Sequence, residues 1–309
     1  MEQGLKDAGT VRAAKPGNIL SNGTRFRNRG GPYITERKEK TMKKLLCFAL
    51  CTILLFSCSS AALAAGTAQT DTVQDILDRS RAVDASCETT VQQQANAAYR
   101  LTELLALLAE ESTDSAGDRD LIAEIRDSLY SNDEDCETAG HQTVNGLYRS
   151  AELLYVLSQM MDSEGDFSGS IREVYEHWQS ADDAAETTDE QIVNGLYRCV
   201  EFLAIIGYIN AKSDDHVEQI NDALEQSRTL DGKAENVRQQ QVNGVYRMVQ
   251  LLTVIAFELD SSGDYLTTIR GIVEDFADRE AAAEDAQDQL VNGFYRSVEL
   301  AAVVAYEIG

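Results

Sequence analysis

Apolar positions in this sequence follow a helical period inside a larger unit of 49 residues. The segment 171–178 places Ile171, Val174, Tyr175 and Trp178 at the i, i+3, i+4 and i+7 spacing that forms one face of a helix. A longer apolar segment follows an acidic linker and extends to about residue 208. The two segments predict a hairpin of one short amphipathic helix and one long helix.

The hairpin recurs five times without a gap. A motif of the form Q-x-x-N-x-x-Y-R marks each long segment, and its tyrosines are Tyr99, Tyr148, Tyr197, Tyr246 and Tyr295. A second register in the short segments has the same spacing, at Val73, Ile122, Ile171, Ile220 and Ile269. Internal repeats of this length are typical of stacked helical arrays. The five units account for residues 65–309.

The repeat predicts an all-α fold of five tandem 49-residue helical hairpins. One hairpin cannot bury its apolar face alone, whereas stacked neighbours can, so we expect an α-solenoid in a superhelical or bundle-like array. A closed ring is the alternative, and it requires strong curvature. The period and motif match neither tetratricopeptide nor armadillo arrays.

A small residue stands two positions before each tyrosine. It is glycine in four units and Ala97 in the first. Alanine disfavours the left-handed conformation that a glycine hinge needs. We therefore expect each long helix to continue through this position, where the small side chain lets a neighbouring helix approach closely.

The first 64 residues have the features of a leader. Met42-Lys43-Lys44 precedes the apolar run 45–56, and the small residues 61–65 follow, so residues 42–64 predict a secretory signal peptide cleaved after Ala64. The run is shorter than the roughly 20 residues of a membrane-spanning helix. Residues 1–41 lack apolar periodicity, and we interpret them as a mis-assigned upstream extension, disordered if translated, with Met42 as the true start.

A second form of processing competes with cleavage after Ala64. The residues before Cys58 resemble a bacterial lipobox, which predicts lipidation of Cys58 and a membrane-anchored lipoprotein. Phe56 departs from that pattern, in which a small residue is usual.

Charge divides at the same boundary. Residues 1–64 carry 11 basic and 4 acidic side chains, whereas residues 65–309 carry 16 and 48, a net charge of −32. A nucleic-acid partner requires a basic face, so this class is excluded as the main partner. After removal of the signal we expect no transmembrane helix.

Polar residues repeat along one stripe of each long helix. Relative to the tyrosine, glutamine stands at −6, asparagine at −3, arginine at +1 and glutamate at +4, and these spacings share a helix face. The binding candidates are Asn96, Tyr99, Arg100, Asn145, Tyr148, Arg149, Asn194, Tyr197, Arg198, Asn243, Tyr246, Arg247, Asn292, Tyr295 and Arg296. Their expected structural partners are Gln93, Gln142, Gln191, Gln240, Gln289, Glu103, Glu152, Glu201, Gln250 and Glu299.

Two roles fit this repeated set of polar residues, which we call the ladder. Buried, it is a hydrogen-bonded network repeated between units. Exposed, it lines a groove that holds an extended partner. Because Gln250 replaces glutamate in the fourth unit, Arg247 is the best candidate for an anionic ligand.

Other reactive side chains give weaker signals. Cys87 and Cys136 share a register, so a disulfide in an oxidising compartment is an open alternative. The three histidines lack metal-ligand spacing, and we expect no metal site and no cofactor. Acidic loops, such as the one beginning at Asp162, imperfectly resemble calcium loops, which leaves weak divalent-cation binding open.

These patterns predict a non-enzymatic, exported helical-repeat scaffold of a bacterial cell envelope, periplasmic or secreted, that binds a protein or peptide. Catalysis needs a unique constellation of groups, whereas this chain repeats its polar residues five times. The alternatives are polysaccharide or cell-wall binding through the Asn-Tyr-Arg ladder, and a purely structural envelope lipoprotein.

Overall fold

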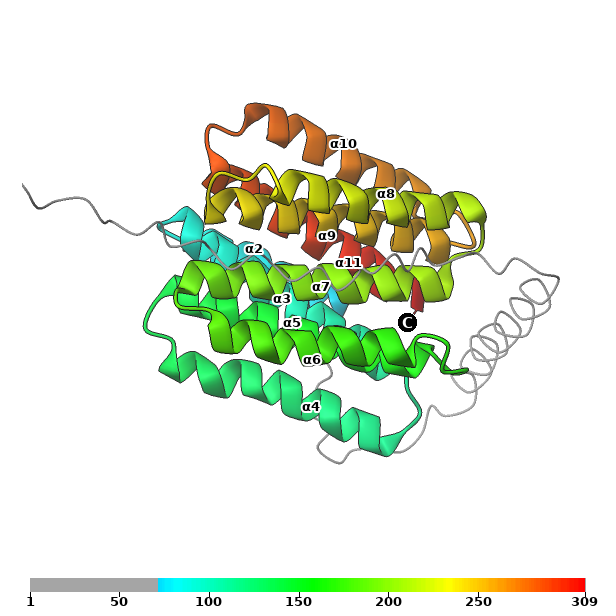
Figure 1. Ribbon diagram of the computed structural model, residues 1–309. Helices are drawn as coiled ribbons and strands as arrows, with labels where there is room; N and C mark the ends of the chain where they lie inside the picture. The colour runs from blue at the N-terminus through cyan, green and yellow to red at the C-terminus, as the bar shows by residue number, and fades with distance from the viewer. Residues whose placement is uncertain (1–71, 309) are drawn as a thin grey trace, which may run out of the picture. The chain divides into compact units, whose positions relative to one another are not determined.

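The computed structural model describes residues 72–308, and every regular element in that range is helical (Figure 1). The all-α prediction is therefore confirmed. The predicted signal segment and Cys58 lie outside the described residues, and the processing of the leader stays a prediction.

Short and long helices alternate along the chain. The short helices are α2 (Val73–Asp84), α4 (Ala116–Ser131), α6 (Ser168–Ala184), α8 (Asp214–Asp231) and α10 (Leu266–Ala282). The long helices are α3 (Thr90–Glu111), α5 (Ala139–Met161), α7 (Thr188–Asn210), α9 (Val237–Leu259) and α11 (Ala286–Ile308). A 3-10 turn, η2 (Asn132–Asp135), follows α4.

Capping residues at one register fix where the long helices begin. The side chains of Thr89, Thr138, Thr187, Asn236 and Asp285 each accept a hydrogen bond from the backbone N–H three residues later. Such a cap satisfies an N–H group that has no partner within the helix. The repeated sequence thus starts the long helix at the same point in every unit.

The five long helices form a closed ring instead of an open superhelix. Helix α11 packs against α3 as extensively as consecutive long helices pack on one another. Hydrogen bonds cross the closure, among them one of 2.9 Å from Gln287 Nε2 to Gln94 Oε1. The expectation of an open solenoid is corrected by these contacts: each unit turns about the common axis by enough for the fifth to meet the first.

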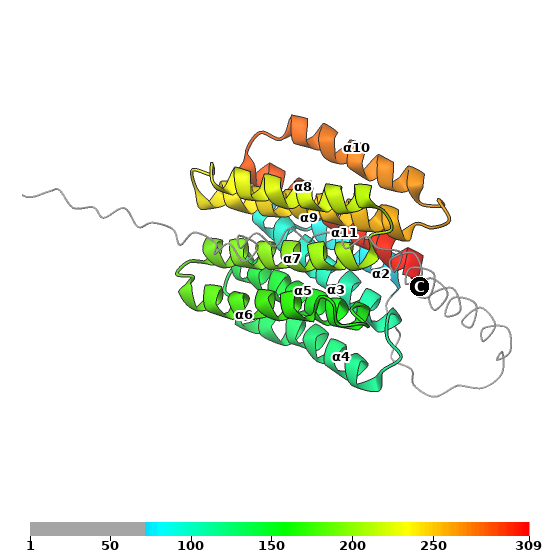
Figure 2. The ribbon, with the colours of Figure 1, turned by 45° about the vertical axis from the view of Figure 1, so that its right-hand side comes forward.

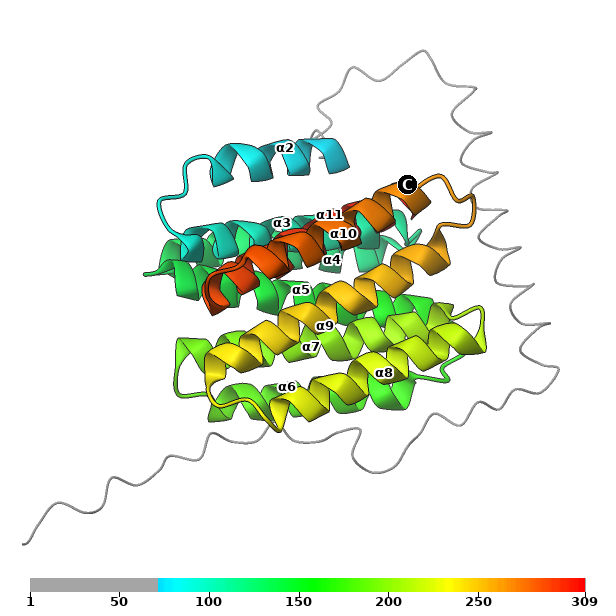
Figure 3. The same cartoon turned by 90° about the horizontal axis from the view of Figure 1, so that it is seen from above.

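The short helices lie outside this ring. Figure 2 shows α4 and α10 at opposite outer edges, with the long helices between them. In Figure 3, α2 lies on the side away from α6 and α8. Each short helix packs on the long helix that follows it, and α4, α6, α8 and α10 also contact the long helix before them.

Burial follows from this arrangement. A short helix buries one stripe, as α6 does with Ile171, Val174 and Trp178. A long helix faces the ring axis on one side and packs against two neighbouring long helices and the short helices on the others. It is therefore apolar on nearly all sides. By length and composition, α7 and α9 are apolar enough to span a membrane, but most of each apolar window is buried within the protein.

Small residues set the distance between consecutive long helices. The long helices continue through their glycines, as the sequence predicts. A Cβ atom at Gly195 would lie 2.8 Å from Leu147 Cβ, and one at Gly293 would lie 2.7 Å from Val245 Cγ1. Such distances are shorter than van der Waals contact, so glycine is what allows these helices to approach.

We expect Gly195→Ala to lower the free energy of unfolding by about 1–3 kcal/mol, because the added methyl group overpacks the α5–α7 contact. Gly271→Ala is the matched control, since Gly271 lies on α10 with no atom within 4 Å of the added Cβ. This control should gain roughly 0.5–1 kcal/mol from the greater helix preference of alanine. Urea denaturation followed by circular dichroism measures both, and equal effects would refute the close-packing interpretation.

Candidate functional site

The ladder tyrosines join each unit to the next. In four of the five units, the hydroxyl group donates to an aspartate near the end of the following unit's short helix, as Tyr99 Oη does to Asp133 Oδ1 at 2.7 Å. The other pairs are Tyr148–Asp182, Tyr197–Asp231 and Tyr295–Asp84. Tyr295–Asp84 joins the fifth unit to the first, so the ladder also closes the ring.

The ladder asparagines bond to the same junctions. Asn145 Nδ2 donates to the Leu129 carbonyl at 2.8 Å and to Tyr99 Oη at 3.1 Å. Asn96 and Asn292 donate to the equivalent carbonyls of their own short helices, those of Ser80 and Phe276. Each amide therefore fastens a long helix to its short helix, and in the first two units it also contacts the tyrosine of the preceding unit.

One of the five tyrosine junctions departs from this pattern. Glu280 occupies the register that aspartate holds in the other units, and its Oε1 accepts from Gln289 Nε2 at 2.8 Å. The hydroxyl group of Tyr246 is buried and has no hydrogen-bond partner within residues 72–308. The longer carboxylate thus bonds to its own unit and not to the preceding tyrosine.

Burial affects the protonation of these junctions. Desolvation, followed by the hydrogen bond to Asp182, raises the pKa of Tyr148 far above its ordinary value. Desolvation also raises the pKa of Asp182 and of Asp231, against the lowering effect of their tyrosine donors. The phenols are therefore protonated donors throughout the physiological range.

The ladder arginines pair with glutamates one turn later on the same helix. The Arg Nη1 to Glu Oε2 distance is 2.8 Å for Arg100–Glu103, Arg149–Glu152 and Arg296–Glu299, and 3.0 Å for Arg198–Glu201. The guanidinium groups are largely withdrawn from solvent, and the side chain of Arg198 is only 3% exposed. The structure thus places the Asn-Tyr-Arg set between the layers of helices, and a binding role for it stays a prediction.

Arg247 lacks such a carboxylate within the described residues. Its Nη1 donates to Gln226 Oε1 at 2.8 Å and to the side chain of Gln250. Arg247 is itself buried, with 5% of its surface exposed. The anion predicted for this arginine would have to displace the two glutamines that hold it.

The remaining candidates from the sequence are the cysteine pair, the potential metal ligands and the acidic loops, and the structure does not bring them together into a site. Cys87 and Cys136 are free thiols, so the disulfide left open by their shared register is not formed. Within residues 72–308, no group of three potential metal ligands occurs. In the acidic loop after α5, Asp162 Oδ2 accepts from the backbone N–H of Phe167 at 3.0 Å, which closes a turn.

A cluster without a counterpart in the other units lies beside α9. The carboxylate of Glu258 is 2% exposed and contacts His216, and its Oε1 accepts from the backbone N–H of Lys212 at 2.9 Å. These contacts fasten the α7–α8 connection to the end of α9. Sequence reasoning missed the cluster because Lys212 and Glu258 are 46 residues apart within the fourth unit, and the set of three residues does not repeat in the other units.

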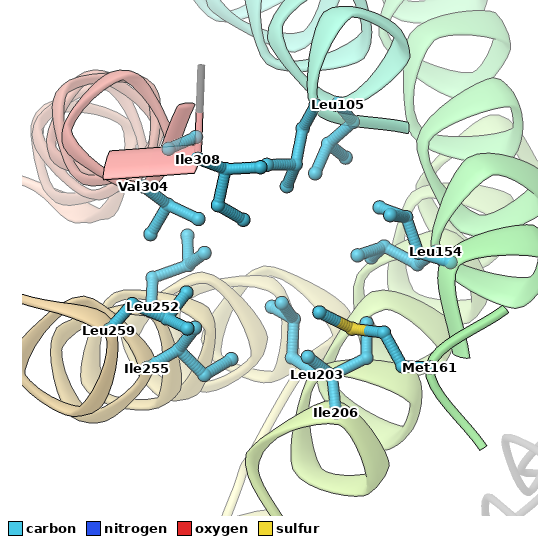
Figure 4. Close-up of a pocket in the computed structure, with 13 residues that line it drawn as sticks. Leu105, Leu154, Met161, Leu203, Ile206, Leu252, Ile255, Leu259, Val304 and Ile308 are labelled. Carbon is cyan, nitrogen blue, oxygen red and sulfur yellow. The ribbon is translucent and has the colours of Figure 1, made fainter. Parts of the chain in front are cut away.

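The largest departure from the sequence predictions is an apolar pocket on the ring axis, which we call the mouth. It lies toward the C-terminal ends of the long helices, and all five contribute to it (Figure 4). One layer consists of Leu105, Leu154, Leu203, Leu252 and Ala301, and the next of Leu108, Leu157, Ile206, Ile255 and Val304. Met161, Leu259 and Ile308 form the outer layer.

The mouth is narrow and partly open. The space available to a water-sized sphere is about 20 Å³, slightly more than one water needs. Met161, Leu259 and Ile308 are each partly exposed. At their register the first and third units carry Ser112 and Asn210, so the outer layer is apolar on three of its five sides.

Comparison with protein-family models, with curated proteins and with solved structures finds no match to this chain. The site is therefore interpreted from its own residues.

The two kinds of tyrosine junction provide a matched test. We expect Tyr197→Phe to lower the free energy of unfolding by about 1–3 kcal/mol, because Asp231, in a partly buried site, loses one of its two donors within the described residues and keeps only Asn243. Tyr246→Phe removes a hydroxyl group that has no partner, so its stability should be unchanged or slightly higher. Thermal and urea denaturation measure both variants, and equal losses would show that the hydrogen bond is not the stabilising element.

Stability should also decline as pH rises. Burial raises the pKa of Glu201 from 4.5 to about 7, despite the attraction of Arg198. The folded state then holds this proton more tightly than the unfolded state, so the contribution is complete below pH 4.5 and is lost as pH approaches about 7. Glu201→Gln should flatten the fall in melting temperature across this window. Glu176→Gln, at an exposed position on α6, is the control and should leave the slope unchanged.

Proposed function

We propose that this chain is an exported, non-catalytic helical-repeat protein of a bacterial envelope that binds a protein or peptide partner at the mouth of its ring. The observation that carries the proposal is the mouth itself, a partly open pocket lined by aliphatic side chains from all five long helices. A concave apolar pocket is the usual location of a binding site. The predicted leader supports export.

The mouth is a better binding surface than the ladder. The ladder side chains already bond to one another between units, as Tyr99 does to Asp133 and Arg100 to Glu103. A ligand at the ladder would have to break these bonds and separate packed helices. At the mouth, the outer side chains are already partly exposed to solvent.

The size and chemistry of the mouth favour an aliphatic side chain of a peptide. Its small free space admits a side-chain tip but no complete ring. Met161 is flexible and can move aside to admit a larger group. Sugar hydroxyls would lose their hydrogen bonds to water against a carbon-only lining, which disfavours the polysaccharide alternative at this site.

Selection from a displayed random-peptide library tests the proposal. The bait is the protein recovered after expression with its own leader, and the comparison is the double variant Met161→Ser, Leu259→Asn. These replacements are the residues that units one and three carry at this register, so the ring already accommodates them. We expect enriched peptides to share an aliphatic residue and to bind the variant about tenfold more weakly, a difference of about 1.4 kcal/mol.

Leu121→Asn is the matched control, because Leu121 is an exposed leucine on α4 that does not line the mouth. It should leave peptide binding unchanged. Failure to enrich any peptide, or equal binding to the mouth variant, would refute the proposed function.

A further inference from the structure

Five helix C-termini meet around the mouth. Residues of one register on every long helix line the same end of the pocket, so the long helices are parallel and their carboxyl ends lie together. A helix C-terminus carries a partial negative charge of about half an elementary charge. The backbone alone therefore makes this end of the ring attractive to cations.

Each residue of the apolar outer layer has an acidic residue next to it in sequence. Asp162 follows Met161, Asp260 follows Leu259, and Glu307 precedes Ile308 in sequence. All three carboxylates are partly exposed. We call Asp162, Asp260 and Glu307, together with Glu111 at the end of α3, the acidic rim.

Two of the rim carboxylates, those of Glu307 and Asp260, are close enough to influence one another. Burial raises the pKa of Glu307, and the neighbouring Asp260 and Asp264 raise it further. Lys212 interrupts the rim and lowers the pKa of Glu307, although its Nζ also lies 3.9 Å from Glu258 Oε2. The four rim carboxylates outnumber this one lysine, so the rim keeps an excess of negative charge.

We infer that the partner presents a cationic amphipathic segment, with one aliphatic side chain in the mouth and flanking lysine or arginine residues on the acidic rim. This inference rests on the proposed function and specifies the partner's chemistry. An aliphatic tip matches the carbon lining, and the cations match both the rim and the helix ends. Acidic segments would be repelled by the rim and by the −32 charge of residues 65–309.

A fluorescein-labelled synthetic peptide of leucine and lysine, arranged to form an amphipathic helix, is the probe. Its binding to the recovered protein is measured by fluorescence anisotropy at low and high salt. Two further peptides replace every leucine by alanine, or every lysine by glutamate. We expect only the leucine–lysine peptide to bind tightly, with affinity falling about tenfold or more as salt is raised.

Protein variants separate the mouth from diffuse charge. Met161→Ser with Leu259→Asn should weaken the leucine–lysine peptide about tenfold without changing net charge. Asp162→Asn with Asp260→Asn should weaken it and reduce its salt dependence, whereas Leu121→Asn should have no effect. Melting curves establish that each variant is folded, and Ser112 and Asn210 show that the mouth replacements are compatible with the ring.

Equal affinity of the mouth variant, or no binding of the leucine–lysine peptide at all, would overturn the inference. Tight binding of the glutamate peptide would also overturn it. The library selection could instead enrich neutral or acidic peptides whose binding depends on Met161 and Leu259. That result would support peptide binding at the mouth and refute only the inference that the partner is cationic.

Discussion

The close contact between consecutive long helices is the constraint on which the structure depends. Each glycine two residues before the ladder tyrosine lies against the residue that precedes the tyrosine of the previous unit, as Gly195 does against Leu147. The same contact repeats with the same geometry, so it rotates each unit by a similar amount. Four such contacts bring α11 beside α3, where Ala97 takes the place of the glycine, and ring closure joins the two ends of the array.

Ring closure changes the role of the repeated polar residues from lining a groove to joining neighbouring units. In an open superhelix, a row of Asn, Tyr and Arg could face a concave groove. In the ring these side chains lie between the inner and outer helices, where Tyr295–Asp84 is equivalent to the junction Tyr99–Asp133. A buried polar group needs a partner, and the repeat supplies nearly the same partner at each junction. The ladder thereby fixes the register of neighbouring units.

Ring closure also creates the feature on which the proposed function rests. Parallel long helices bring five aliphatic faces together on one axis, and they bring five carboxyl ends and several carboxylates to its opening. No single unit contains a pocket. Leu105 and Leu252 belong to the same site only because the chain returns to its starting point.

The sequence by itself determined the short and long helical segments and the repeating unit, because helical periodicity and the 49-residue register are local properties. It also identified the close approach at Gly195 and the pairing of Arg198 with Glu201, since both follow from spacing along one helix. The aspartate junctions share a register that could have been found, but the tyrosine partner of each aspartate lies in the preceding unit, 34 residues earlier for Asp133. Only the tertiary structure decided between ring and superhelix, because the rotation per unit depends on side-chain packing between helices and not on the pattern within one.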